Sequence, residues 1–226
     1  MSVERLVLAV NLKAYPQAFT RYMDLAREAR LLSERLSRVR IILAVPAPLV
    51  YPVGSVYDDV YLQHVDSVDY GSHTGYLPAR AVEHLPVKGT LLNHSEHKIT
   101  YRSLAKAAQE VKAAGKEVLI CADTPTEAAA VALLGPTMVA VEPPELIGTG
   151  IPVSRAKPEV ITSAVEAVKR VAPQVPLLAG AGISSPEDAV KAIELGARGV
   201  LVASHIVKAH DPAERLRRMA EAVEEA

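Results

Sequence analysis

Eight short apolar runs recur along the chain, and amphipathic segments separate them. The runs are rich in β-branched residues and apolar at nearly every position, which is typical of parallel strands buried on both faces of a sheet. Because periodicity of this kind continues almost to the end of the chain, it constrains the fold more than any other feature. We predict strands at residues 6–10, 41–45, 60–65, 90–92, 118–121, 138–141, 176–179 and 199–202.

The segments between these runs have the spacing of amphipathic helices. Thr124 and Ser185 each precede a proline and an acidic residue, a combination typical of a capped helix start. Gly115, Gly135 and Gly196 stand where helices would end. We predict helices at residues 20–36, 101–114, 125–134, 158–172, 186–195 and 212–225, with shorter helical segments at 47–54 and 78–84.

Strands that alternate with helices imply parallel pairing through crossover connections. Eight repeats in 226 residues fit a single (β/α)8 barrel, a fold that often has about this length. A doubly wound open sheet fits the same alternation, because periodicity alone does not close a sheet. No stretch rich in glycine, serine or charge divides the chain, so we predict an α/β fold with one domain over residues 1–226.

The composition predicts a soluble globular protein of the cytoplasm. Half of the residues are hydrophobic, and the formal net charge of −1 gives no reason to expect a nucleic acid or a membrane surface as a partner. No apolar run reaches the roughly 18 residues of a transmembrane helix, and the first residues lack the pattern of a signal peptide. The single cysteine, Cys121, excludes an internal disulfide and fits a reducing compartment.

Asparagine occurs only twice, at Asn11 and Asn93. Depletion of thermolabile amides is one trend of hyperthermophile proteins, and we hypothesise a hot environment for this chain. Both asparagines lie at the ends of predicted strands, so we expect each of them to have a specific function.

Polar and small residues follow most of the predicted strands. In a barrel of this kind the active site lies at the carboxyl ends of the strands, so these positions are the candidates for chemistry. A carboxylate, a histidine, a lysine and glycine-containing loops together predict proton transfer on a small anionic substrate. The positions are Asn11 to Lys13, Gln63, His64, Asn93 to Glu96, Cys121 to Asp123, Glu142, Gly180 to Gly182, Ala203 and Ser204.

Glu142 is the candidate base, because it leaves an apolar strand directly into a loop that begins with two prolines. Burial there would disfavour the carboxylate and so make it a stronger base. The alternative is a strand-end glutamate paired with a nearby lysine or arginine. Stiff prolines at one end of the loop and glycines at the other, up to Gly150, predict a short lid that excludes water.

His94 is the candidate electrophile. It precedes a short turn into the helix that begins near Tyr101, and a helix N-terminus disfavours the cationic imidazole, so His94 would act as a neutral hydrogen-bond donor. His94 and His97 are also spaced as metal ligands on one turn, with Glu96 between them. Because no H-E-x-x-H motif or cysteine cluster accompanies them, we expect no metal site.

Lys13 lies two residues beyond a buried strand, where its ammonium would neutralise a phosphate or an enediolate, or its amine would form a Schiff base. Gly182, Ala203 and Ser204 follow the last two strands, where barrels commonly bind phosphate through backbone N–H groups and a short extra helix, here at 204–209. The glycines at 180 and 182 also form half of a dinucleotide fingerprint, but the third glycine and the acidic partner are missing.

Four motifs resemble those of the triosephosphate isomerase family and occur in that family's order along almost the whole chain. They are Asn11-Leu12-Lys13, Asn93-His94-Ser95-Glu96, Val141 to Pro144 continued by Ile147 to Gly150, and Gly199 to Ser204. Residues 71–75 also resemble the interdigitating loop through which these enzymes pair. The short chain is similar to archaeal members of the family, which tend to be tetramers.

The resemblance implies a TIM barrel that interconverts dihydroxyacetone phosphate and D-glyceraldehyde 3-phosphate in glycolysis and gluconeogenesis. It implies Glu142 as the base, His94 as the electrophile, and Lys13 with Asn11 as stabilisers of the enediolate. It also implies that the backbone of Ile147, Gly148, Gly182, Ala203 and Ser204 binds the substrate phosphate, and that no metal or organic cofactor is needed.

The chain departs from the family pattern at three places. The lid has Pro144-Glu145-Leu146 where a tryptophan is usual, which implies a different packing of the lid. Gly182 replaces a serine whose hydroxyl would face the phosphate, while backbone donors are kept. His97 stands where an arginine is common, so the contacts that support the catalytic residues must differ.

Two other function classes remain. A Schiff-base aldolase would use Lys13 as its nucleophile, and a non-catalytic barrel would bind a phosphorylated metabolite without needing Glu142. A phosphoribosyl anthranilate isomerase would require a cysteine after the first strand, where this chain has Asn11 and Lys13, although Asp123 does follow the fifth strand.

Overall fold

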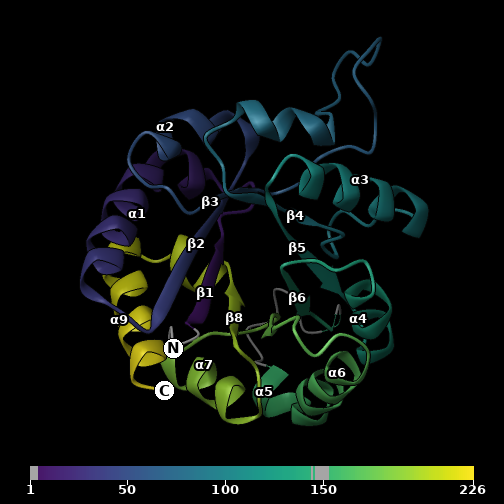
Figure 1. The fold of residues 1–226 in the computed structure, drawn as a ribbon. Helices are drawn as coiled ribbons and strands as arrows, with labels where there is room; N and C mark the ends of the chain where they lie inside the picture. The colour runs from purple at the N-terminus through teal and green to yellow at the C-terminus, as the bar shows by residue number, and fades with distance from the viewer. Residues whose placement is uncertain (1–4, 144, 146–152) are drawn as a thin grey trace.

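The computed structural model describes residues 5–143, 145 and 153–226. Eight parallel strands pair in sequence order, and the last pairs with the first, so that the sheet closes into a barrel (Figure 1). This closure confirms the (β/α)8 barrel and excludes the open sheet. The strands are β1 (Leu6–Asn11), β2 (Val39–Val45), β3 (Val60–Leu62), β4 (Gly89–Leu92), β5 (Glu117–Ala122), β6 (Met138–Val141), β7 (Leu177–Ala179) and β8 (Gly199–Val202).

Closure depends on a glycine at the start of β8. Gly199 has φ +148°, and its Cα lies so near the facing strand that a Cβ would stand 2.0 Å from the carbonyl oxygen of Val7. Val7 is the residue of β1 that pairs with Gly199 in the register. Only a residue without a side chain can therefore occupy position 199, where β8 pairs with β1.

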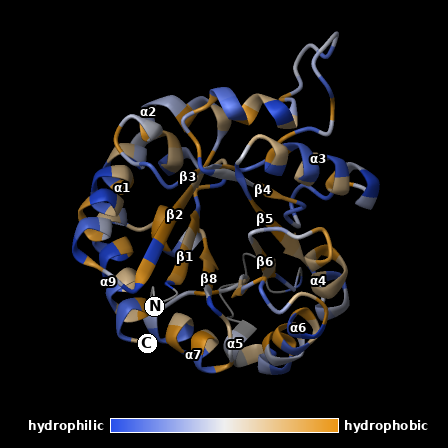
Figure 2. Ribbon diagram, in the orientation of Figure 1, coloured by the Kyte–Doolittle hydropathy of each residue, from blue (hydrophilic) through white to orange (hydrophobic). Residues whose placement is uncertain are grey.

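The strands are apolar on both faces because each face is buried in a different environment. One set of side chains fills the barrel interior, and the other packs beneath the surrounding helices. Figure 2 shows the strands of the barrel coloured mostly as hydrophobic. This arrangement explains the nearly continuous apolar runs of the sequence. The interior set consists of Val7, Ala9, Ile42, Ala44, Tyr61, Leu91, Leu119, Cys121, Met138, Ala140, Leu178 and Leu201.

Helices surround the strands as the alternation predicts. Several begin with a capping side chain and a proline; the hydroxyl of Thr124, for example, accepts a hydrogen bond from the amide of Glu127 at 3.1 Å. The helices are α1 (Pro16–Arg35), α2 (Val50–Gly54), α3 (Tyr101–Ala113), α4 (Pro125–Ala132), α5 (Val153–Ala156), α6 (Pro158–Val171), α7 (Pro186–Glu194), α8 (Ser204–Val207) and α9 (Pro212–Glu225), with 3-10 turns η1 (Ala47–Leu49) and η2 (Ala79–His84).

The boundaries differ from the predicted ones at a few places. Helix α1 begins four residues earlier than predicted, at Pro16, because proline is well suited to the first helical position. Strand β3 ends at Leu62 instead of residue 65, and the Gln63 side chain that follows turns back to hydrogen-bond the first βα loop. The short helix α5 was not predicted from the sequence.

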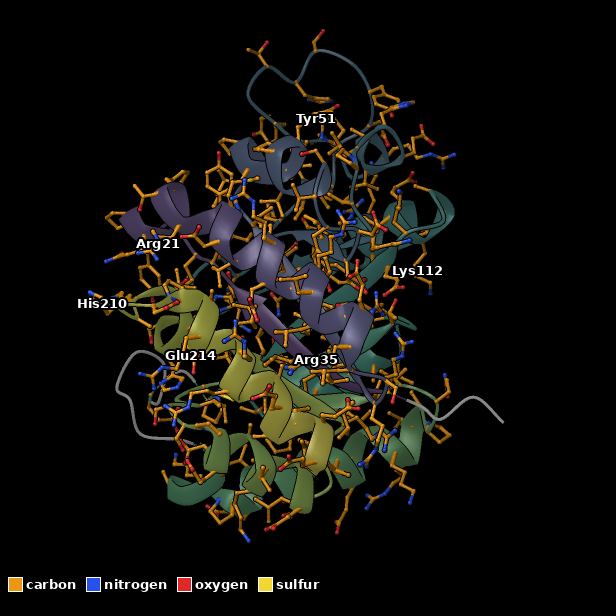
Figure 3. The ribbon with its side chains drawn as sticks, turned by 90° about the vertical axis from the view of Figure 1, so that its left-hand side faces the viewer. Arg21, Arg35, Tyr51, Lys112, His210 and Glu214 are labelled. Atoms are coloured by element: carbon orange, nitrogen blue, oxygen red, sulfur yellow. The ribbon has the colours of Figure 1, made fainter. Side chains whose placement is uncertain are left out.

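Two long helices lie side by side on one flank of the barrel. Figure 3 shows α1 beside α9, and the two are joined by an ion pair between Arg217 and Glu28, with nitrogen and oxygen 2.9 Å apart. Within the described residues, every helix is too short or too polar to span a bilayer.

The segment between β3 and η2 does not pack along the barrel but projects away from it (Figure 1).

Candidate functional site

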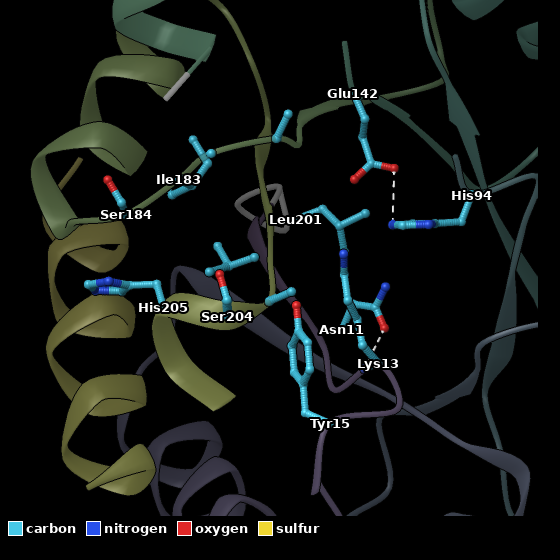
Figure 4. A pocket seen from close by; sticks show the side chains of 14 residues that line it. Asn11, Lys13, Tyr15, His94, Glu142, Ile183, Ser184, Leu201, Ser204 and His205 are labelled. Atoms are coloured by element: carbon cyan, nitrogen blue, oxygen red, sulfur yellow. Dashed lines mark hydrogen bonds and ion pairs between the residues drawn. The ribbon is translucent and has the colours of Figure 1, made fainter. Parts of the chain in front are cut away.

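A cavity opens at the carboxyl ends of the strands, and every described residue that was predicted for catalysis or phosphate binding lines it (Figure 4). The first, fourth, sixth, seventh and eighth strands all contribute to it, so residues distant in the sequence meet in one place. The lining residues are Asn11, Lys13, Tyr15, His94, Glu142, Ala181, Gly182, Ile183, Ser184, Leu201, Val202, Ala203, Ser204 and His205.

Glu142 and His94 face each other across one side of this cavity (Figure 4). Both residues are buried, with 4% and 7% of their surfaces exposed, and His94 Nε2 lies 3.6 Å from Glu142 Oε2. That carboxylate oxygen has no hydrogen-bond partner among the described residues. A buried oxygen without a partner is costly, and it is therefore available to a ligand in the cavity.

The hydrogen bonding of His94 assigns its tautomer. The backbone N–H of Glu96 donates to Nδ1 of His94 at 3.1 Å, so Nδ1 carries a lone pair and the ring proton belongs to Nε2. Because Nε2 faces the cavity and Glu142, the neutral imidazole presents a donor to whatever occupies the cavity.

Gly180 provides the space in which the Glu142 carboxylate lies. A Cβ on Gly180 would be 2.4 Å from Glu142 Cγ and 2.8 Å from its Oε1. The sequence placed Gly180 in a phosphate-binding loop, whereas the structure places it directly against the candidate base. The glycine is therefore a steric requirement of the Glu142 position.

Lys13 and Asn11 are held together at the end of β1. The amide of Lys13 donates to Asn11 Oδ1 at 3.0 Å, and Gln63 Nε2 donates to the same oxygen at 3.0 Å. The Asn11 amide nitrogen is consequently the group left to donate toward the cavity. Lys13 Nζ lies 2.6 Å from Glu96 Oε1, so its ammonium has a carboxylate partner at the rim of the cavity.

The loops after β7 and β8 form the opposite wall (Figure 4). Ala181 and Gly182 have φ values of +64° and +70°, a tight left-handed turn in which alanine is strained. Ala203 precedes α8, and the first N–H groups of a helix have no partner within it. The predicted short helix after β8 is thus present, though it ends at Val207 instead of residue 209.

Several lining residues were not anticipated from the sequence. Tyr15 lies four residues beyond the end of β1, and Lys208 Nζ lies over its ring, 4.2 Å from the centroid. Ile183, Ser184 and His205 follow residues that were singled out, so a longer search of the same loops would have found them. Leu201 and Val202 were predicted as strand residues and as part of the motif from Gly199 to Ser204, without a place in the site.

Other sequence candidates lie elsewhere. His97 stacks on His64, with ring centroids 4.0 Å apart, and neither lines the cavity. Cys121 lies within the barrel, where burial raises the pKa of its thiol well above the ordinary value. Asp123 pairs with Lys98 at 2.7 Å. Ile147 and Gly148, with most of the predicted lid, lie outside the described residues.

A metal site is not formed by the described residues. Their histidine, cysteine and carboxylate side chains gather nowhere in a group of three or more that could hold an ion. The half fingerprint at Gly180 to Gly182 lies in a closed barrel. The dinucleotide-binding fold is an open sheet with a different strand order, so this segment does not have the setting of a dinucleotide site.

Comparison with known proteins gives one consistent result. The sequence profile described as triosephosphate isomerase matches residues 6–223. The chain is 43% identical to the triosephosphate isomerase of Methanosarcina barkeri over 207 residues, which cover 91% of this chain and 93% of the relative. It is 43% identical to that of Archaeoglobus fulgidus over 206 residues, with coverage of 91% and 92%, and 40% identical to that of Methanocaldococcus jannaschii over 215 residues, with coverage of 95% and 98%.

Proposed function

Because this chain belongs to the triosephosphate isomerase family, we propose that the cavity at its barrel mouth is the active site for that family's reaction. The chain is an intramolecular isomerase that interconverts dihydroxyacetone phosphate and D-glyceraldehyde 3-phosphate. Glu142 acts as the base, His94 as the electrophile, and Lys13 with Asn11 stabilises the developing negative charge.

The reaction moves one proton between neighbouring carbons. Glu142 removes a proton from the carbon beside the substrate carbonyl, and an enediolate forms as the carbonyl oxygen gains negative charge. His94 donates its Nε2–H to that oxygen and transfers hydrogen between the two substrate oxygens. Glu142, now protonated, returns the proton to the adjacent carbon, which completes the isomerisation without any net gain or loss of atoms.

One observation carries these roles. The buried, unpartnered Oε2 of Glu142 lies 3.6 Å from the Nε2 of His94, and the hydrogen bond from Glu96 to Nδ1 leaves the proton on that Nε2. A base and a neutral acid that face the same cavity fit proton removal beside a carbonyl. A strand-end glutamate with a structural ion pair would instead have a cationic partner, and the described neighbour is a neutral imidazole.

The remaining groups bind the anionic part of the substrate. The ammonium of Lys13 and the amide of Asn11 lie at the β1 side of the cavity. The backbone of Gly182, Ala203 and Ser204, in the loops after β7 and β8, suits a phosphate because tight turns and helix starts present free N–H groups. By resemblance, the backbone of Ile147 and Gly148 completes this phosphate site. No metal or organic cofactor takes part.

The Lys13 contacts argue against a Schiff-base aldolase. An amine nucleophile must be free to attack the substrate, whereas Lys13 Nζ forms an ion pair with the Glu96 carboxylate, with nitrogen and oxygen 2.6 Å apart. A non-catalytic binding barrel would not need a buried carboxylate oxygen without a hydrogen-bond partner, such as Glu142 Oε2, because such an atom costs stability.

The replacement Glu142→Gln tests the assignment of the base. We expect kcat to fall by at least roughly 10²–10⁴-fold, the usual contribution of a general base, while inorganic phosphate and phosphoglycolate still bind. A coupled assay measures D-glyceraldehyde 3-phosphate formed from dihydroxyacetone phosphate, and calorimetry measures binding.

The control is Glu34→Gln, which removes an exposed carboxylate of α1 that pairs with Arg30, far from the cavity. It should retain full activity. Turnover by Glu142→Gln close to that of the unchanged chain would overturn the role of Glu142, and borohydride trapping of substrate on Lys13 would favour the aldolase.

We further propose that the chain forms a homo-oligomer, a tetramer in preference to a dimer, in the cytoplasm. The projecting segment between β3 and η2 supports assembly, because Tyr70 and Tyr76 are each 58% exposed on it. The lone cysteine, buried within the barrel, supports a reducing compartment.

A further inference from the structure

Asn93 immediately precedes His94 and holds an unusual backbone conformation. Its φ is +59°, in the left-handed region, and only 3% of its surface is exposed. The side-chain amide nitrogen donates to the carbonyl of Cys121 at 3.0 Å, which anchors the residue to the end of β5. This residue therefore sets the direction in which the chain leaves β4 toward His94.

The side chain of Asn93 also closes the turn that contains His94. Its Oδ1 accepts the backbone N–H of Ile99 at 3.3 Å, six residues later, and inside the turn His97 N–H donates to the carbonyl of His94 at 2.8 Å. The two ends of the 93–99 turn are thus linked through one amide side chain.

Glu127, in the first turn of α4, reaches both ends of this turn. Its Oε1 accepts from Asn93 Nδ2 at 2.9 Å and from Lys98 Nζ at 3.0 Å. Its Oε2 accepts from the backbone N–H of Asp123 at 2.7 Å. Lys98 also pairs with Asp123 Oδ1 at 2.7 Å, so the group bridges β4, β5 and α4.

Glu127 is ionised in this environment. Burial opposes the charge, but the N–H of Asp123 and the ammonium of Lys98 outweigh it and hold the pKa of Glu127 below its ordinary value. The ordinary value is already near 4, so the carboxylate persists at neutral pH. Glu127 does not line the cavity and has no direct access to a bound substrate.

We propose that Glu127 is a positioning residue for the isomerisation: it holds Asn93 and Lys98 at the two ends of the His94 turn, and thereby keeps His94 Nε2 directed at the substrate carbonyl. The inference rests on the electrophilic role proposed for His94. Because Glu127 acts through the position of the imidazole, its loss lowers kcat and leaves the KM for substrate nearly unchanged.

The variant Glu127→Gln tests this role. A glutamine offers one acceptor oxygen and one NH2 group, so it loses either the bond from Asp123 N–H or the shared bonds from Asn93 and Lys98. We expect kcat to fall roughly tenfold or more, because a displaced catalytic group costs up to about 10²-fold, with KM changed less than about threefold.

The matched control is Glu194→Gln, which removes the same charge from an exposed glutamate paired with Lys191 on α7, and which should leave kcat and KM unchanged. A second variant, Asn93→Gly, tolerates the left-handed φ and removes only the side chain, so it keeps the test independent of backbone strain. It should lower kcat about as much as Glu127→Gln does. The double variant should lose little more kcat than either single variant.

A double-mutant cycle with His94→Ala distinguishes positioning from a general loss of structure. In the His94→Ala background, measured at high enzyme concentration, Glu127→Gln should change the residual kcat less than twofold. Nitrogen NMR of the imidazole provides a readout without turnover, because the His94 Nδ1 signal should shift or broaden in Glu127→Gln and stay constant in Glu194→Gln.

Three results would overturn the inference: an unchanged kcat in Glu127→Gln, an equal loss in both backgrounds, or an unaltered His94 signal. A failure of the proposed function is recognised separately, because the unchanged chain would then lack isomerase activity or His94→Ala would retain it.

Discussion

Within the described residues, three non-glycine residues have positive φ angles, and all three lie in the loops at the barrel mouth. They are Lys13 at +50°, Asn93 at +59° and Ala181 at +64°. Each follows a strand that ends in the site, and each costs of order 1–3 kcal/mol of backbone strain. Strain concentrated at these positions fits a site in which side chains are held for chemistry at some expense of stability.

A single methyl group at Gly180 should be enough to disturb the candidate base. In Gly180→Ala the new Cβ would stand 2.4 Å from Glu142 Cγ, so the carboxylate must move away from its position opposite His94. We expect kcat to fall by about 10²-fold, as for other displacements near 1 Å, while phosphate binding changes little. Steady-state kinetics and phosphate titration measure the two effects.

Thermal melting shows whether the Gly180→Ala barrel remains folded, since the substitution lies beside β7. If the variant is folded and retains full kcat, the carboxylate position is not the reason for the glycine.

At the scale of elements, the two ends of the barrel have different roles. The carboxyl ends of the strands carry the cavity, whereas the amino ends carry a polar network across β2, β3 and β5. The side chain of Tyr61 lies in the barrel interior, and its hydroxyl donates a hydrogen bond to Glu117. Arg40 pairs with both Glu117 and Asp59. In a barrel of this kind the amino ends of the strands serve stability, and the loops at the carboxyl ends serve chemistry.

Buried tyrosines beside this network should make the protein sensitive to alkaline pH. Burial raises the pKa of Tyr61, and the Glu117 carboxylate raises it further; burial also raises the pKa of Tyr57. The unfolded chain releases these protons near pH 10, and the folded chain keeps them. The two protonated tyrosines therefore make their full contribution to the free energy of unfolding below about pH 10. As the pH rises above this value, the contribution falls by about 1.4 kcal/mol per pH unit for each tyrosine.

Urea unfolding between pH 8.5 and 11.5 measures this decline. Tyr61→Phe should reduce the slope above pH 10 by about 1.4 kcal/mol per pH unit, and Tyr51→Phe, at an exposed position on α2, is the control that should leave it unchanged. An identical slope in Tyr61→Phe would exclude the assignment.

At the scale of the whole molecule, the segment between β3 and η2 stands apart from the barrel (Figures 1 and 3). Its neck is tightly closed, because Asp66 N–H donates to the Leu77 carbonyl at 2.7 Å and Leu77 N–H returns a bond to Asp66 Oδ2 at 2.7 Å. Beyond this neck the aromatic rings of Tyr70 and Tyr76 are exposed. A firmly held projection with exposed aromatic residues suits contact with a second copy of the chain.

Light scattering should give a molar mass about four times the 24.2 kDa of the chain. Tyr76→Asp should shift the protein to smaller species, because it places a charge at the centre of the proposed contact. Leu31→Asp adds the same charge at an exposed apolar position of α1 and is the control. A monomeric mass would contradict assembly, and a stable dimer would correct the number of subunits.

Most of the fold was predictable because strand burial leaves a direct signal in the sequence. The apolar runs located all eight strands, since both faces of each strand are buried, and the capped prolines at Thr124 and Ser185 located two helix starts. Polar strand ends also located Glu142, His94, Lys13 and Asn11. Boundaries were predicted less well, as β3 shows: the apolar Val65 extended the predicted strand past the polar Gln63 and His64. The strand ends at Leu62, and the Gln63 side chain instead contacts the first loop.

The alternation of elements, the candidate residues and, through four motifs in order, the family all follow from the amino-acid pattern. Which of these residues meet depends on the three-dimensional fold. Gly180 lies against Glu142, and Glu127 reaches Asn93 across 34 positions of the chain, because closure of the barrel brings neighbouring strands together regardless of their separation in sequence. Local patterns carry no signal for contacts of this kind, which depend on where the closed barrel places each strand end.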